Sequence, residues 1–156
     1  MSAGPHLLLI YLLVTATFQD PAARDGAPDF LTPQERSRLA RESKAEGRVG
    51  VYQAASQRYE ATVTKLVAGE QLEALSSALA QWRLLLDTSL KDIEAGVVPG
   101  KKPKNVRRYE IHLRKVLSDM TRLKKTGTVE MFDALEAWCT RAEAVRQRIV
   151  DIMFAK

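Results

Sequence analysis

Apolar residues recur every three or four positions along four stretches of this chain, a spacing that predicts one buried face on each of four helices. The longest stripe runs from Leu72 to Ile93. Similar stripes run from Tyr52 to Leu66, from Val106 to Leu123 and from Met131 to Ile152. No stretch shows the two-residue alternation of a half-buried strand, so the pattern predicts an all-α protein.

Proline and glycine mark where these helices begin and end. Thr32, Pro33 and Glu35 form a capping-box sequence with proline at the first helical position, which predicts that the first helix begins there. The last apolar positions of the first three stripes are followed by helix-ending glycines, which are Gly69, Gly96 and Gly127. The fourth helix is predicted to begin near Thr128.

Short connections near 68–70 and 126–128, with one longer loop between the second and third helices, predict an antiparallel up-and-down bundle of four helices over residues 32–156. The first half of the first helix, residues 34–48, is mostly charged or small and is expected to project into solvent. Gly47 and Gly50 predict a hinge there. A three-helix bundle with the first helix as an arm is therefore the alternative fold.

The N-terminal segment predicts export. Leu7 to Val14 is an unbroken apolar run, too short for the roughly 20 residues of a membrane-spanning helix. We interpret residues 1–16 as a signal peptide cleaved after Ala16. The lack of Lys and Arg before the run leaves open an uncleaved membrane anchor or a buried helix. Residues 17–31, with two prolines and a glycine, are expected to form a flexible linker.

The inventory of reactive side chains is small. The chain has one cysteine and two histidines, and only His112 and Cys139 lie beyond residue 16. Structural zinc sites use four Cys or His ligands, and di-iron bundles use paired Glu-x-x-His motifs. No phosphate-binding glycine loop, GxSxG or HExxH motif occurs in the sequence. We therefore expect no metal, no cofactor and no enzymatic activity.

His112 and Cys139 lie on the flanks of apolar stripes. We interpret His112 as a boundary residue and Cys139 as a small, partly buried hydrophobe. A pH-sensing role for His112 is the alternative, as is a homodimer linked through Cys139 in an oxidising compartment. Trp82 and Trp138 lie at stripe positions and are expected in the core.

Positive charge is concentrated in one segment of a chain whose net charge is +5. The densest group, on the loop that enters the third helix, comprises Lys101, Lys102, Lys104, Arg107 and Arg108. This loop is a candidate site for anionic lipid, an acidic polymer or an acidic protein. The alternative is that its helix pairs with the acidic helix over 72–96. Nucleic acid is not expected, because no aromatic residues interleave with the cations.

One short motif resembles a known group of proteins. Leu31 to Glu35 reads LTPQE and is similar to the LTxxQ opening of small periplasmic stress-response chaperones, with Glu35 in place of Gln. Those proteins are also exported and all-helical, so the resemblance implies a periplasmic, chaperone-like role. A capping box accounts for the same residues.

Taken together, the sequence predicts an exported, non-enzymatic helical protein that acts through protein–protein contact. The polar half of the first helix is the segment expected to need a partner. Binding of an anionic surface through residues 101–108 is the alternative, and an enzyme or cofactor carrier is the third class.

Overall fold

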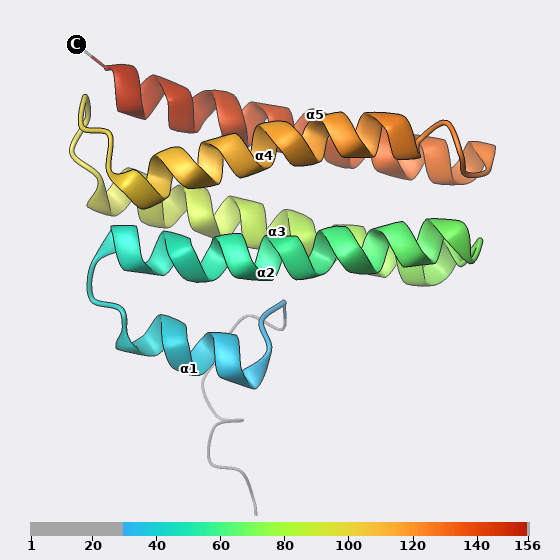
Figure 1. Ribbon diagram of the computed structural model, residues 1–156, viewed down its shortest axis with the longest axis horizontal. Coiled ribbons are helices and arrows are strands. Elements are labelled where there is room, and N and C mark those ends of the chain that lie inside the picture. The colour runs from blue at the N-terminus through green and yellow to red at the C-terminus, as the bar shows by residue number, and fades with distance from the viewer. Residues whose placement is uncertain (1–29, 156) are drawn as a thin grey trace, which may run out of the picture.

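The computed structural model describes residues 30–155 and has five helices in that range (Figure 1). The helices are α1 (Pro33–Arg41), α2 (Ala45–Ala68), α3 (Leu72–Gly96), α4 (Lys104–Leu123) and α5 (Val129–Phe154). No strand occurs within this range, which confirms the all-α prediction. The predicted signal peptide and the linker up to residue 29 lie outside the described residues. None of the five helices is long and apolar enough to span a membrane.

The first predicted helix is in fact two helices, because the chain turns at residues 42–44. Glu42 leaves the helical conformation with φ −88° and ψ 107°. The hinge predicted at Gly47 and Gly50 is wrong, since both glycines lie inside α2. A Cβ atom at Gly47 would meet only the Glu42 side chain, which is exposed and free to move aside.

Helix α1 packs back along the first half of α2 instead of projecting into solvent (Figure 1). No residue of α1 itself is buried, but Phe30 and Leu31 just before it are. Arg58 of α2 donates a hydrogen bond to the Phe30 carbonyl at 2.9 Å and forms a 2.8 Å ion pair with Glu35. The last two residues of the predicted linker thus belong to the core, and Arg58 ties α1 to α2.

The other four helices form two antiparallel hairpins, α2–α3 and α4–α5, which lie side by side in the same orientation (Figure 1). Ion pairs between the hairpins establish this orientation. Arg141 pairs with Asp87 at 2.7 Å, and Arg148 pairs with Glu94 at 2.8 Å, so residue numbers rise in the same direction along α3 and α5. Helix α2 packs in the same parallel sense on α4.

This arrangement differs from the predicted up-and-down order, in which α3 and α4 would be neighbours. Helix α3 packs on α2 and α5, and α4 packs on the same two helices from the other side. The seven residues 97–103 carry the chain diagonally across one end of the molecule. Seven extended residues can span about 24 Å. The diagonal between helices with axes 8–10 Å apart is only about 14 Å. A loop of this length therefore does not force its two helices to pack together.

Two short motifs recur at matching places in the two hairpins. Val-x-x-Tyr occurs at residues 49–52 and 106–109, and Ala-Leu-x-x-Trp occurs at 78–82 and 134–138. Every valine, tyrosine, leucine and tryptophan of these motifs is buried. The two tryptophans meet between α3 and α5 with ring centroids 4.1 Å apart. The same apolar pattern therefore builds each half of one shared core.

Two leucines on α3 provide a matched test of this core. Leu86 is fully buried, whereas Leu84 is 56% exposed. We expect Leu86→Ala to lower the free energy of unfolding by about 2–5 kcal/mol, because it removes apolar contacts and leaves a cavity. Leu84→Ala should change it by no more than about 0.5 kcal/mol. Urea denaturation followed by circular dichroism measures both, and equal losses would contradict the assignment of α3's buried face.

Candidate functional site

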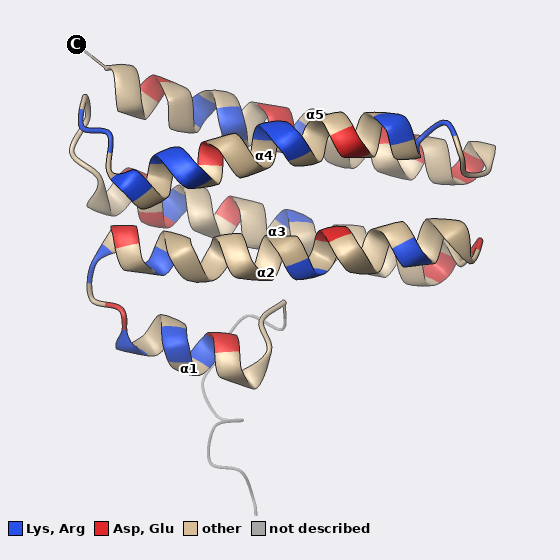
Figure 2. Ribbon diagram, viewed as in Figure 1, with Lys and Arg blue, Asp and Glu red and all other residues tan. Residues whose placement is uncertain are grey.

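The five cations singled out by the sequence all lie on the surface at one end of the molecule (Figure 2). We call this group the basic end; it comprises Lys101, Lys102, Lys104, Arg107 and Arg108. The first two precede α4 and the others occupy its first two turns. Every one of the five side chains is exposed. The linear cluster in the sequence is therefore also a cluster in space.

The loop that carries the basic end is fixed to the neighbouring helices. The Gly100 N–H donates to the Ile152 carbonyl near the end of α5 at 2.9 Å. Gly100 has φ +79°, and a Cβ atom there would lie 2.8 Å from the Ala155 carbonyl oxygen, so glycine is required on both counts. The Asn105 side chain donates to the Glu46 carbonyl at 3.0 Å, which ties the start of α4 to the start of α2.

Ion pairing separates the basic end from the remaining cations of α4. Farther along the helix, Lys115 pairs with Glu60 and Asp119, and Arg114 pairs with Glu110. None of the five cations of the basic end forms an ion pair within residues 30–155. The predicted pairing of this helix with α3 is also wrong, because the acidic groups of α3 pair instead with Arg48, Arg141 and Arg148.

Exposed apolar side chains lie beside these cations. Val98 is 64% exposed, and Phe154 is 61% exposed. The ammonium group of Lys102 lies 3.9 Å from the centre of the Phe154 ring, within the range of a cation–π contact. The basic end therefore combines unpaired positive charge with apolar groups, and the sequence alone did not indicate that Phe154 belongs to it.

The helix that begins in the basic end gains nothing from these charges. Positive groups oppose the helix dipole at an N-terminus. Helix α4 has no acidic residue of its own in its first turn, and its N-cap residue Pro103 offers no side-chain cap; one carboxylate from α2, that of Glu46, accepts the Asn105 N–H at 3.4 Å. Local stability would favour Asp, Glu, Ser or Thr at these positions. The cations are therefore not explained by the folding of α4, and an external anion would offset their mutual repulsion.

A groove of about 560 Å³ runs between α2 and α4, next to the basic end. Arg108 and Lys115 line it together with His112. His112 is buried, with 8% of its surface exposed, so the predicted boundary position understated its burial. Its Nε2 lies 3.0 Å from the Ser56 hydroxyl, which also accepts a 3.0 Å hydrogen bond from the Trp82 indole N–H. This contact between helices was not foreseen from the sequence.

The Ser56 contacts favour one tautomer of His112. Because Trp82 can only donate, the buried hydroxyl proton of Ser56 finds an acceptor in His112 Nε2. The imidazole is then neutral, with its proton on Nδ1. Burial, aided by the positive charge of Lys115, lowers the pKa of His112 to about 4. Protonation would turn Nε2 into a donor, so the Ser56 hydroxyl proton would lose its acceptor, and it would place a charge in the core.

Cys139 lies in the core on α5 with 8% of its surface exposed. Burial raises the pKa of its thiol, which disfavours the reactive thiolate. This environment fits the interpretation as a small hydrophobe better than a bridge between two copies. In the described part of the chain, no three His, Cys, Asp or Glu side chains are grouped so that they could hold a metal ion.

Comparison of this chain with protein-family models, curated proteins and solved structures gives no match. The class of protein is therefore defined by its structure alone: over residues 30–155 it is an all-helical protein with two hairpins, an added N-terminal helix and a basic end that forms no ion pair within that range.

The His112 contact predicts a specific pH dependence. Folding lowers its pKa from about 6.5 to about 4, so the unfolded chain binds the proton more tightly between these values. The contribution of His112 to the free energy of unfolding should be complete above pH 6.5 and should decrease as the pH falls to 4. We expect the loss to be about 2 kcal/mol, less than the full shift implies because the ring edge meets the groove.

Measurement of the free energy of unfolding at several pH values, in wild type and His112→Gln, isolates this contribution. The variant should lose about 2 kcal/mol less than wild type over this window. Proton NMR of the wild-type imidazole should show the titration near pH 4. A midpoint at pH 6–7 would mean that the ring is hydrated and not bonded to Ser56.

Proposed function

We propose that this protein is an exported, non-enzymatic binding protein whose basic end docks on an acidic lipid surface. The observation that carries the proposal is the clustering of five exposed cations within eight residues, none of which forms an ion pair within residues 30–155. Other cations of the same helix are paired with acids.

The apolar neighbours favour lipid over other anionic partners. Each Lys or Arg near an acidic bilayer surface contributes about 1 kcal/mol of attraction, which falls off within a Debye length. Exposed aliphatic and aromatic side chains add to this by entering the boundary between head groups and acyl chains. Val98 and Phe154 are placed for this role, since the Phe154 ring contacts Lys102. A purely polyanionic partner has no apolar layer in which Val98 and Phe154 could be buried.

A charge-reversal variant tests the basic end. We expect Lys101→Glu/Lys102→Glu/Lys104→Glu to weaken binding to phosphatidylglycerol-containing vesicles at least about a hundredfold, because three favourable terms of about 1 kcal/mol become repulsive. Wild-type binding should fall as salt rises and should be absent on phosphatidylcholine alone. Vesicle co-sedimentation across a salt series measures this.

A matched control separates local from net charge. Lys65, Lys91 and Lys125 are exposed lysines outside the basic end, and none forms an ion pair among the described residues. Reversing these three gives the same net charge as reversing the other three, and should leave most binding intact. The proposal would be refuted if both triple variants lost vesicle binding equally, or if the wild type did not bind the vesicles at low salt.

The apolar pair distinguishes lipid from an acidic polymer. Val98→Ser/Phe154→Ser should weaken vesicle binding but leave retention on heparin unchanged, because heparin has no apolar layer to enter. If the double variant behaves as wild type on both supports, the basic end recognises charge alone, as an acidic protein or polymer would require.

Protein contact through α1 is the second candidate function. Helix α1 has no buried residue and packs mainly on α2 among the described helices. Its outward side chains Gln34, Arg38 and Arg41 are exposed. A chaperone-like role belongs to this candidate, although the capping box formed by Thr32 and Glu35 accounts for the motif that suggested it.

Site-specific crosslinking in cells tests the α1 candidate. A photoreactive residue at Arg38 should capture one defined protein, whereas the same residue at exposed Lys91 on α3 should not. The same set of products from both positions would contradict a dedicated α1 interface.

A further inference from the structure

The groove between α2 and α4 begins at the basic end. Its lining runs from Asn105, in the first turn of α4, to Lys115, so it extends about 15 Å along that helix. Arg108 belongs both to the groove and to the basic end. In the described part of the chain no acidic residue lines the groove, and Lys115 at its far end is already paired with Glu60 and Asp119. An anion in the groove is therefore drawn toward Arg108.

His112 brings a fixed hydrogen-bond donor to the floor of the groove. Only 8% of this residue is exposed, and its Nε2 is held by the Ser56 hydroxyl, so the proton of the neutral ring lies on Nδ1. Nδ1 has no hydrogen-bond partner among residues 30–155, and it is not enclosed, because the one enclosed and unpartnered side-chain nitrogen or oxygen of this range is Trp138 Nε1. His112 follows Arg108 by one helical turn, so both lie on the same face of α4.

The facing wall of the groove carries two amide side chains. Gln53 and Gln57 lie one turn apart on α2, and both line the groove. Neither is hydrogen-bonded to a described residue, whereas Gln81 and Gln147 each bond another side chain. A carboxamide both donates and accepts, which suits the hydroxyl groups of a ligand. The groove therefore presents charge and an N–H donor on α4, and groups that match hydroxyls on α2.

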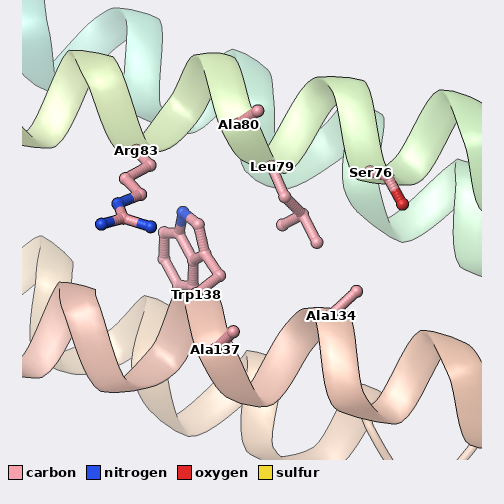
Figure 3. Close-up of a pocket in the computed structure, with 7 residues that line it drawn as sticks. All are labelled: Ser76, Leu79, Ala80, Arg83, Ala134, Ala137 and Trp138. Carbon is pink, nitrogen blue, oxygen red and sulfur yellow. The ribbon is translucent and has the colours of Figure 1, made fainter.

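A depression between α3 and α5 lacks this chemistry. Its volume is about 180 Å³, and small residues that include Ala80, Ala134 and Ala137 form much of its lining (Figure 3). The Trp138 indole nitrogen beside it is enclosed by protein, so no ligand atom reaches it in this structure. The groove between α2 and α4, whose unpartnered polar groups are accessible, is the better ligand site.

We propose that this groove holds the head group of one acidic phospholipid that carries hydroxyl groups, the phosphoglycerol of phosphatidylglycerol. The inference rests on lipid docking through the basic end and adds a specific contact to it. The phosphate pairs with the Arg108 guanidinium and accepts the His112 Nδ1–H. The glycerol hydroxyls bond the amides of Gln53 and Gln57. The groove volume of about 560 Å³ lies within the roughly 300–1,000 Å³ of most ligand sites.

Two lipids of equal charge test the proposal. Phosphatidylglycerol and phosphatidylethanol each carry one phosphodiester charge, but only the first has hydroxyl groups on its head group. We expect wild type to bind vesicles of phosphatidylcholine with phosphatidylglycerol about tenfold more tightly than vesicles with the same fraction of phosphatidylethanol, because the α2 amides bond only the hydroxyls. Equal binding to both would overturn this inference and leave lipid docking intact. Binding to neither would overturn lipid docking itself.

An uncharged pair of substitutions locates the preference. Gln53→Ala/Gln57→Ala should lower the affinity for phosphatidylglycerol vesicles about tenfold, to the level of phosphatidylethanol, and leave the affinity for phosphatidylethanol unchanged. Gln34 and Gln71 are exposed glutamines outside the groove, and their double alanine variant should keep the full preference. If the two double variants behave alike, the amides of the groove do not contact the head group.

Filling the groove gives a second matched comparison. Ala54 lines the groove, whereas Ala61 is exposed on the same helix outside it. Ala54→Leu should remove the preference for phosphatidylglycerol, and Ala61→Leu should retain it. Circular dichroism checks that both variants remain folded. Retention of the preference in folded Ala54→Leu would overturn the proposal.

NMR with the deacylated head group, glycerophosphoglycerol, separates a lipid from a soluble ligand. The ring ¹⁵N signals of His112 and the amide signals of Gln57 should shift in a saturable way, while the amide signals of Gln71 stay in place. The affinity should be far lower than for phosphatidylglycerol vesicles, because the other cations of the basic end act only at a charged surface. Unmoved His112 and Gln57 signals would overturn the site, and equal affinity would overturn its assignment to lipid.

Discussion

The structure depends on the meeting of the two hairpins at Trp82. Its ring packs at a tilt of 38° against Trp138 of α5, with centroids 4.1 Å apart, and stacks on Tyr59 of α2 at 6.0 Å. Its indole N–H bonds Ser56, and the Ser56 hydroxyl contacts His112 of α4. One fully buried side chain on α3 thus connects all four long helices. Large buried aromatic groups contribute most to such a core, and the polar contacts fix its geometry.

The parallel placement of the hairpins determines where the surface charge lies. Because α3 and α4 are diagonal to each other, the chain must cross one end of the molecule between Gly96 and Lys104. Hydrogen bonding of Gly100 to Ile152 holds this crossing against α5. The loop therefore lies over the end of the core. The acids of the second half of α3, which are Asp87, Asp92 and Glu94, are paired with Arg141, Arg48 and Arg148 of α5 and α2 and not with cations of the loop.

Local periodicity was sufficient to predict the helices and most of their buried faces, since Leu75, Leu79, Trp82, Leu86 and Ile93 are all buried as their spacing requires. It did not predict the turn at residues 42–44, because no proline or glycine ends α1; there the Leu39 carbonyl accepts the Glu42 N–H and a hydrogen bond from Arg48 of α2. Nor could it predict which hairpin faces meet, because every stripe offers a similar apolar surface. The basic cluster was visible in the sequence, whereas Ser56–His112 and Trp82–Trp138 became neighbours only through that choice of faces.

Ion pairing explains how the basic end differs from the rest of α4. Where this fold brings acids and bases within reach it pairs them, even at the partly exposed positions of Arg48 with Asp92 and Arg146 with Glu110. No acid among residues 30–155 lies within ion-pair distance of the five cations of the basic end. Because these side chains are exposed, water hydrates them and their unpaired charge costs little, so the group can act at a distance on an anionic surface.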